Sequence, residues 1–179
     1  MGVDGGIQDA PVVNEEEACE SLCFNFHTKK KILLSKVGKN HVTIAKIIKE
    51  IRRGSKTKKQ FSELNIDAVH ITDLIDKDLV LKQRQYHHTP HAFNFAKEGD
   101  ILIPRVGKRS IMRESLVASG ADYYTDSIFK LTASTENETE ILWGAISSDF
   151  GKEWRGIYSQ GKCAKYLTCE ALMSMPLLN

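Results

Sequence analysis

The chain has 179 residues, of which 41% are hydrophobic and 27% are charged, a composition typical of a soluble globular protein with one domain. No uncharged apolar run approaches the roughly 20 residues that cross a membrane, and the N-terminus lacks the basic and apolar regions of a secretory signal. The four cysteines do not indicate a disulfide scaffold in a chain of this size. We therefore expect a cytoplasmic protein.

The net charge of +2 conceals a strongly uneven distribution. Residues 1–28 hold six acidic residues and no lysine or arginine, whereas residues 29–59 hold twelve basic residues and one acid, Glu50. Such a basic block is a candidate surface for a polyanion, because contacts to phosphates release counterions. The alternative is a solvated basic face, covered by the acidic N-terminal segment. We expect residues 1–40 to form an acidic tail and a basic lead-in, partly disordered, ahead of a single domain over residues 41–179.

Two helices are predicted in the first third of the chain. A short one over Glu15–His27 would end where Lys29–Lys31 breaks the apolar pattern. A clearer one covers Thr43–Arg53, where isoleucines recur at the spacing of one helical face, at Ile44, Ile47, Ile48 and Ile51. Thr43 suits the N-cap and Gly54 the C-terminal end, and Gly54–Gln60 then forms a polar, lysine-rich loop.

From residue 67 the hydrophobic period changes to that of short strands. Strands are predicted at Val69–Thr72, Leu79–Leu81 and Ile101–Val106, followed by a hairpin-like pair made of Leu116–Ala118, a Ser119-Gly120 turn and Ser127–Thr132. Two helices follow, one over Glu138–Phe150 that ends at Gly151 and one over Cys169–Met175 that is capped by Thr168. Helices and strands do not alternate strictly, so the sequence predicts an α+β fold with a mixed, mostly antiparallel sheet.

Motifs for catalysis or metal binding are incomplete. Gly156–Cys163 resembles a phosphate-binding P-loop, but Cys163 replaces the serine or threonine that holds magnesium. Cys19, Cys23 and His27 offer three metal ligands where a structural zinc site needs four, and they equally suit an amphipathic helix. The histidines of His87–His91 fit a polar loop, because Pro90 prevents a regular helix. We expect a binding module with no catalytic residue, metal or cofactor; a small nucleotide- or metal-dependent enzyme remains the alternative from another class.

Five sequence segments, in this order, carry a resemblance to a known family. They are HVTIAKIIKEIRRGSKTKKQ, VHITDLIDKDLVL, KEGDILIPRVGKRS, SLVASGADYYTDSIFKLT and ILWGAISSDFGKEWRGIYSQGKCAKYLTCEALMSMPL, which together span most of residues 42–178. The chain resembles the target recognition domain of type I restriction-modification specificity subunits, and the related C-terminal domain of N6-adenine DNA methyltransferases. The Gly-Asp, apolar strand and Arg-x-Gly of the third segment match best.

This resemblance implies that residues 41–179 form a twisted sheet flanked by helices that reads double-stranded DNA and performs no chemistry. It implies a DNA methyltransferase (modification) subunit as partner, with a restriction subunit as a further candidate. The chain lacks the Pro-Pro motif and the Phe-x-Gly-x-Gly motif of the methyltransferases, so methylation by this chain is not expected. It could be a stand-alone half of a specificity subunit, a truncated product, or the C-terminal part of a single-chain methyltransferase.

Two basic segments are the candidate DNA contacts. Lysine suits phosphate as a flexible point charge, so the first segment is assigned to positioning; it comprises Arg52, Arg53, Lys56, Lys58 and Lys59. Arginine can bond guanine with two hydrogen bonds, so the second is assigned to base reading; it comprises Arg105, Lys108, Arg109 and Arg113. Lys162 and Lys165 are further candidates. The alternatives are solvated surface charges, or a basic module that binds an acidic protein.

Overall fold

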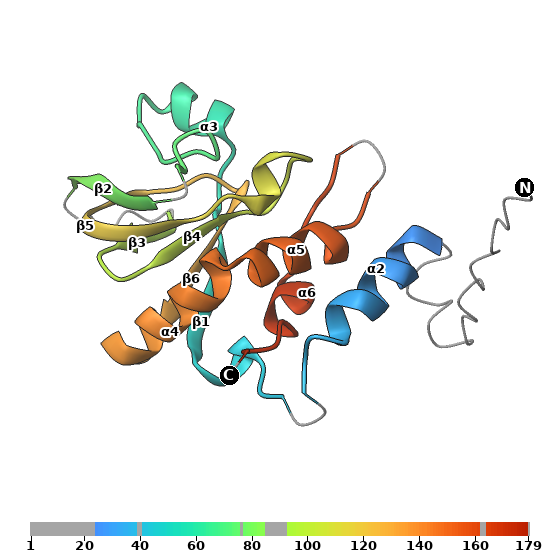
Figure 1. Ribbon diagram of the computed structural model, residues 1–179. Helices are drawn as coiled ribbons and strands as arrows, with labels where there is room; N and C mark the ends of the chain where they lie inside the picture. Colours follow the sequence, from blue (N-terminus) through green and yellow to red (C-terminus); the bar gives the residue numbers. More distant parts are fainter. Residues whose placement is uncertain (1–23, 39–40, 76, 85–92, 162–163, 179) are drawn as a thin grey trace, which may run out of the picture. The chain divides into compact units, whose positions relative to one another are not determined.

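The computed structural model describes residues 24–38, 41–75, 77–84, 93–161 and 164–178 (Figure 1). The chain divides into two compact units, residues 1–38 and residues 39–179, which are described separately. The described part of the first unit contains helix α2, Phe24–Leu34. Lys29–Lys31, expected to interrupt the helix, lies inside α2, because lysine is a good helix former. Cys19, Cys23 and the segment His87–His91 lie outside the described residues.

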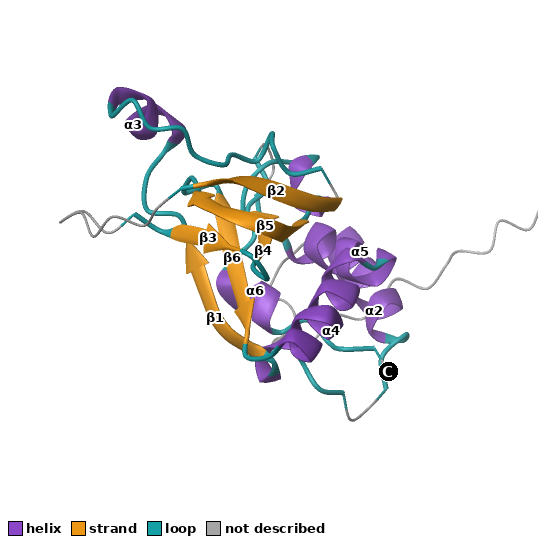
Figure 2. Ribbon diagram, turned by 90° about the vertical axis from the view of Figure 1, so that its left-hand side faces the viewer, coloured by secondary structure: helices purple, strands orange, loops and turns teal. Residues whose placement is uncertain are grey.

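The described strands of the second unit form one six-stranded sheet (Figure 2). They are β1 (Ile48–Arg53), β2 (Lys77–Gln83), β3 (Phe95–Lys97), β4 (Ile101–Pro104), β5 (Ser115–Tyr123) and β6 (Ile128–Ala133). Their order is β1-β6-β4-β5-β2, with β3 also paired to β5. Among the pairings of these described strands, β2–β5 alone is parallel, so the α+β fold with a mixed, mostly antiparallel sheet is confirmed.

The helix predicted over Thr43–Arg53 is wrong. Ile44–Lys46 forms one turn of 3-10 helix, η1, and the remainder is strand β1. Isoleucine is β-branched and favours strands, and β6 supplies a hydrogen-bonded partner that the local pattern does not reveal. Ile51 pairs with Leu131 in the resulting antiparallel ladder, and Ile44 is the one residue of the isoleucine stripe that is fully buried.

The predicted hairpin pair is also wrong, because β4 lies between β5 and β6. β5 runs straight through Ser119-Gly120, which was expected to be a turn. Gly120 has φ +81°, and a Cβ atom there would lie within 3.0 Å of the Leu81 backbone, where the β2–β5 register shifts. Glycine is therefore required for an irregularity in the strand. The strand predicted at Val69–Thr72 is reduced to a single bridge between Val69 and Tyr124.

Helices α4 (Glu136–Ser147) and α5 (Asp149–Tyr158) replace the single helix predicted over Glu138–Phe150. The break falls at Ser148, whose hydroxyl accepts a hydrogen bond from the Gly151 amide at 3.0 Å and so caps α5. Gly151 lies inside α5 instead of ending a helix, at a point where the backbone of α4 leaves no room for a Cβ atom. Helix α6, Cys169–Met173, begins after Thr168 as predicted and ends two residues early.

The core lies on both faces of β4, the central apolar strand, whose four residues are all buried. On one face Leu102 packs with Val117, Tyr124 and Ile128. Helices α4 and α5 lie along one side of the sheet (Figure 2), and α4 packs on β6. A smaller aromatic cluster of Phe61, Phe93 and Tyr123 anchors the short helix α3, Lys58–Glu63.

Candidate nucleic-acid interface

Three strands bring their ends to one edge of the sheet. Because β6 is antiparallel to both β1 and β4, the ends of β1 and β4 lie beside the start of β6. The β5–β6 turn, residues 124–127, is hydrogen-bonded to the chain that follows each of these two strands. The Arg105 amide donates to the Ser127 carbonyl at 2.7 Å, and the Asp126 amide donates to the Lys56 carbonyl at 2.8 Å. The two basic segments predicted from the sequence therefore meet at this turn.

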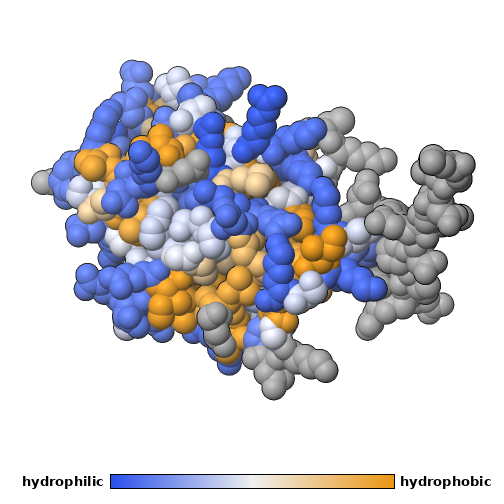
Figure 3. All heavy atoms as spheres, viewed as in Figure 1, coloured by the Kyte–Doolittle hydropathy of each residue, from blue (hydrophilic) through white to orange (hydrophobic). Residues whose placement is uncertain are grey.

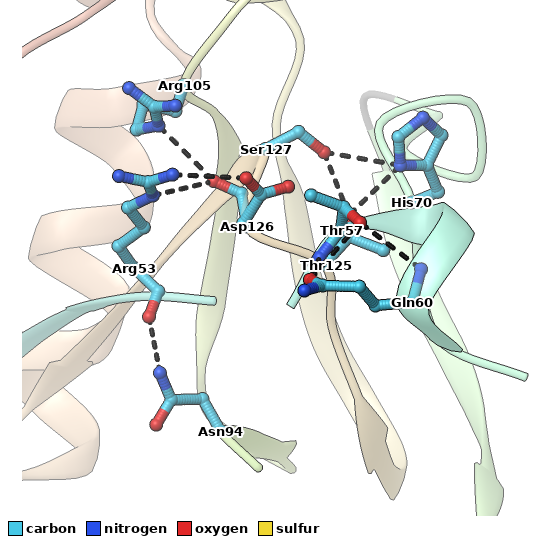
Figure 4. Close-up of polar contacts among 9 residues, drawn as sticks. All are labelled: Arg53, Thr57, Gln60, His70, Asn94, Arg105, Thr125, Asp126 and Ser127. Atoms are coloured by element: carbon cyan, nitrogen blue, oxygen red, sulfur yellow. Dashed lines mark hydrogen bonds and ion pairs between the residues drawn. The ribbon is translucent and has the colours of Figure 1, made fainter. Parts of the chain in front are cut away.

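Asp126 joins the two segments through Arg53 and Arg105 (Figure 4). The Arg53 guanidinium donates to the Asp126 carboxylate at 3.0 Å and to its carbonyl at 3.2 Å. Arg105 donates to the same carbonyl at 3.3 Å. Burial, and then the proximity of Arg53, lower the pKa of Arg105, but an arginine stays charged at neutral pH. Two positive groups are thus held side by side at the Asp126 carbonyl, and one of them, Arg53, also bonds the Asp126 carboxylate.

On the other side of the turn, His70 contacts two hydroxyl groups (Figure 4). Its Nδ1 lies 3.0 Å from the Thr125 hydroxyl and 3.2 Å from the Ser127 hydroxyl, which are 2.8 Å apart. Burial, and then the positive charge of Lys58, lower the pKa of His70 below its usual 6.5. This shift favours the neutral imidazole, whose contacts fix the turn that carries Asp126.

The loop predicted over Gly54–Gln60 ends early, because helix α3 begins at Lys58. The Thr57 hydroxyl accepts from the Gln60 amide at 3.2 Å, and the Gln60 side chain accepts from the Thr57 amide, which completes a capping box. Lys58 and Lys59 lie in the first turn, where the helix dipole disfavours positive charge. Both side chains are exposed; Lys59 is 3.8 Å from Glu63, an exposed pair of little energetic weight.

Two other predicted DNA contacts of the first basic segment, Lys56 and Arg52, differ in whether they lie at the β5–β6 turn. Lys56 is half-buried, with its ammonium 5.5 Å from the centre of the Phe93 ring. Arg52 pairs with Glu50 at 2.6 Å, whereas its neighbour Arg53 pairs with Asp126, because successive side chains of a strand point to opposite faces. The structure therefore brings Lys56 to the turn with Arg53, and does not bring Arg52 there.

The second basic segment continues from β4 into η2, a 3-10 turn over Ser110–Met112. Lys108, Arg109 and Arg113 flank η2 and are exposed. The Gly107 amide donates to the Lys165 carbonyl at 2.8 Å, and the Leu167 amide donates to the Arg105 carbonyl at 2.7 Å. These two hydrogen bonds align the segment with the chain after α5. The Lys165 ammonium donates to the Gly156 carbonyl at 2.8 Å, so it helps to close the C-terminal end of α5. Lys162 lies outside the described residues.

Both basic segments lie toward the same border of the second unit. In Figure 1, α3 lies at the top and η2, the unlabelled yellow turn, lies lower and to its right; hydrophilic side chains project from the upper part of the unit in the space-filling view (Figure 3). Sequence reasoning missed Asp126, His70 and Asn94, whose amide donates to the Arg53 carbonyl. The polar run Thr125–Ser127 between two apolar strands was a signal for a turn, but nothing local revealed which segments it would join.

The described part of Gly156–Cys163 does not have the geometry of a P-loop. Gly156–Tyr158 forms the C-terminal end of α5, whereas a P-loop presents amides at a helix N-terminus. Within the described part of the chain, no group of three or more His, Cys, Asp or Glu side chains could hold a metal ion. None of the helices described there is both long and apolar enough to span a membrane.

Comparisons with known proteins give likeness at the level of fold. No protein-family profile and no curated protein sequence matches the chain. Among solved structures, the chain is similar to the type IIG restriction endonuclease BpuSI, with a TM-score of 0.54 and 11% identity over 89% of this chain and 26% of that protein. The S subunit of a type I restriction-modification system from M. genitalium gives a TM-score of 0.48 and 13% identity over 79% of this chain and 35% of that protein.

The chain thus spans about a quarter of BpuSI and about a third of the S subunit. At this level of identity, the likeness to BpuSI shows a shared fold. The likeness to a restriction-modification protein that the sequence segments indicated is confirmed at the level of fold.

Proposed function

We propose that the chain is a non-catalytic module of a restriction-modification system and that this module recognises double-stranded DNA. The DNA would bind at the basic edge, the group around the β5–β6 turn that comprises Arg53, Lys56, Lys58, Lys59 and Arg105. The observation that carries this proposal is the convergence of two basic segments, about 50 residues apart in sequence, on Asp126. The side chains of Arg53 and Arg105 both donate to Asp126, and the Asp126 amide donates to the Lys56 carbonyl. Lys58 and Lys59 follow directly, in the first turn of α3.

Like charges gathered in this way repel one another and make the folded state less stable. Asp126 compensates part of this charge, and the dipole of α3 opposes Lys58 and Lys59. A polyanion offsets these costs when it binds, because each phosphate contact neutralises a cation and releases counterions. Duplex DNA fits such an edge better than an acidic protein does, since its phosphates form a regular line of charge.

The two segments differ in the chemistry they offer. Lys58 and Lys59 are exposed point charges suited to phosphate, so they position the duplex. Arg105 and Arg109 lie on and beyond the end of the buried strand β4, and arginine can read guanine in the major groove. Lys108, Arg113 and Lys165 extend this second group. Arg52 contributes less, because it is paired with Glu50.

The partners follow from the restriction-modification context, which the fold likeness to part of BpuSI supports. A recognition module that lacks catalytic residues needs a DNA methyltransferase subunit to act at the site it reads, and a restriction subunit is a further candidate partner. The second candidate arrangement is the recognition domain of a single-chain N6-adenine DNA methyltransferase. It is favoured by the observation that BpuSI is about four times as long as the region it shares with this chain.

The test is a salt titration of duplex binding, followed by fluorescence anisotropy. The wild-type chain is compared with the double variant Lys58→Ala/Lys59→Ala and with a matched control, Lys46→Ala/Lys49→Ala. The control removes the same charge at the opposite, starting end of β1. We expect affinity to fall steeply with salt, and the first variant to lower the slope by about one for each phosphate that is no longer bound. A flat salt response, or equal losses of affinity in both variants, would contradict the proposal.

A further inference from the structure

Arg155 of α5 is fully buried and directs its guanidinium at the backbone of the second basic segment. Its Nε donates to the Ile111 carbonyl at 3.1 Å, and its Nη2 donates to the Met112 carbonyl at 3.0 Å. Its Nη1 donates to the Ile146 carbonyl of α4 at 2.6 Å. One side chain therefore ties two adjacent carbonyls of η2 to helices α4 and α5.

A carboxylate compensates the buried charge. Glu114, 1% exposed and one residue beyond Arg113, accepts a hydrogen bond from Arg155 Nη2. Lys152, one turn earlier on α5, lies 3.3 Å from the other Glu114 oxygen. A buried ion pair is often no more stabilising than well-packed apolar residues of the same volume, because both ions lose their hydration. Overall stability is therefore a poor explanation for placing a fully buried arginine here.

We propose that Arg155 is a positioning residue that determines the sequence preference of DNA binding, by fixing the backbone from which Lys108, Arg109 and Arg113 project. This inference rests on the proposed function. Arg155 lies behind these side chains and reaches no DNA itself. It acts through the carbonyls of Ile111 and Met112.

The segment around η2 is held at both ends, while its basic side chains stay exposed. At its start, the Arg105 amide and carbonyl are hydrogen-bonded to Ser127 and Leu167. At its end, Arg155 holds Ile111, Met112 and Glu114. Base reading requires side chains to project from a fixed frame, because a misplaced guanidinium loses its paired hydrogen bonds to guanine. Binding to phosphate tolerates movement, since a lysine charge acts without a fixed direction.

The test separates the preferred sequence from DNA in general. A duplex pool with a randomised centre is selected on the wild-type chain, and affinities are then measured for the selected duplex and for a scrambled duplex of equal composition. The Arg155→Lys variant keeps the positive charge but cannot reach two η2 carbonyls and Glu114 together. The Lys152→Ala variant is the control, because it removes the outer cation and leaves the contacts of Arg155 in place.

We expect Arg155→Lys to reduce the preference for the selected duplex about tenfold, with affinity for the scrambled duplex changed less than about twofold. Lys152→Ala should retain the preference. Thermal unfolding checks that each protein is folded. If Arg155→Lys unfolds, Glu114→Gln takes its place, because glutamine keeps an acceptor for Arg155 without the charge, and a smaller loss of preference is then expected.

The outcomes are distinguishable. A folded variant that retains the full preference, or that loses affinity equally for both duplexes, overturns the role assigned to Arg155 and leaves the proposed function standing. A wild-type chain that binds no duplex at low salt overturns the proposed function, and this inference with it.

Discussion

The Asp126 carboxylate accepts a hydrogen bond from the Arg53 guanidinium at 3.0 Å, across 73 positions of the sequence. The Arg53 side chain remains 51% exposed, and that of Asp126 is 23% exposed. A pair so open to solvent contributes little to stability, roughly 0–1 kcal/mol. Its effect is to orient Arg53 and to place one negative charge in the middle of a basic edge.

Replacing Asp126 with asparagine should strengthen DNA binding. Asp126→Asn removes one negative charge but keeps the backbone carbonyl that bonds Arg53 and Arg105. Affinity for any duplex should rise about two- to fivefold at low salt, because phosphate no longer meets a carboxylate. The measurement is anisotropy on a scrambled duplex, with Asp149→Asn, at an exposed residue in the first turn of α5, as the charge-matched control. A drop in affinity would show that orienting Arg53 matters more than removing the charge.

Lysine and arginine substitutions should have different consequences. Lys58→Ala or Lys59→Ala should weaken binding to all duplexes alike and lower the salt slope by about one for each substitution. Arg105→Ala or Arg109→Ala should cost about 1–3 kcal/mol on the preferred duplex and relax its sequence preference. Paired titrations on preferred and scrambled duplexes measure both effects. The assignment of phosphate contact to the lysines and of base reading to the arginines is wrong if the arginine variants lose affinity equally on the two duplexes.

Gly54 should not tolerate a side chain. A Cβ atom at Gly54 would lie within 3.0 Å of the backbone of Thr125 and Asp126, so Gly54→Ala must separate β1 from the β5–β6 turn. We expect a loss of about 2 kcal/mol or more in the free energy of unfolding, measured by urea denaturation. The control is Gly144→Ala, where nothing lies within 4 Å and helix propensity should add about 0.5–1 kcal/mol. Equal effects at both glycines would contradict the close approach.

Acid should destabilise the fold through His70. Burial, followed by Lys58, lowers the pKa of His70 below 6.5, so the unfolded chain takes up a proton before the folded chain does. The stability that His70 contributes is therefore lost as pH falls below about 6.5, and the loss is complete below the pKa of the folded state. Asp100 acts in the opposite direction, because burial raises the pKa of its carboxyl group.

The check is urea denaturation of the wild-type chain and of His70→Asn between about pH 7 and 5. The difference in unfolding free energy between them isolates His70 from Asp100 and from other titrating groups. As pH falls, the unfolding free energy of the wild type should decrease more than that of His70→Asn. A difference that does not vary with pH would show that His70 titrates alike in the folded and unfolded states.

Local patterns identified the elements whose structure depends mainly on their own residues. The apolar run at Ile101–Val106 predicted a buried strand, which the structure shows over Ile101–Pro104, and Thr168 specified the start of α6. Composition and periodicity also specified the α+β class, and the charge distribution located the first basic segment. These features could be predicted because burial, capping and charge are properties of short stretches of sequence.

Tertiary structure decided what depends on a distant partner. The isoleucines of residues 44–51 fit a helical face, yet pairing with β6 makes most of that segment strand, since a ladder of hydrogen bonds outweighs a small difference in propensity. The insertion of β4 between β5 and β6 is equally invisible locally. Only the folded chain sets Asp126 against Arg53 and Arg105, and Arg155 against the η2 carbonyls. The sequence by itself thus identified the basic residues that are candidates for contact with a polyanion. The strand order decided which of them meet, because contacts between segments far apart leave no periodic signal in either segment.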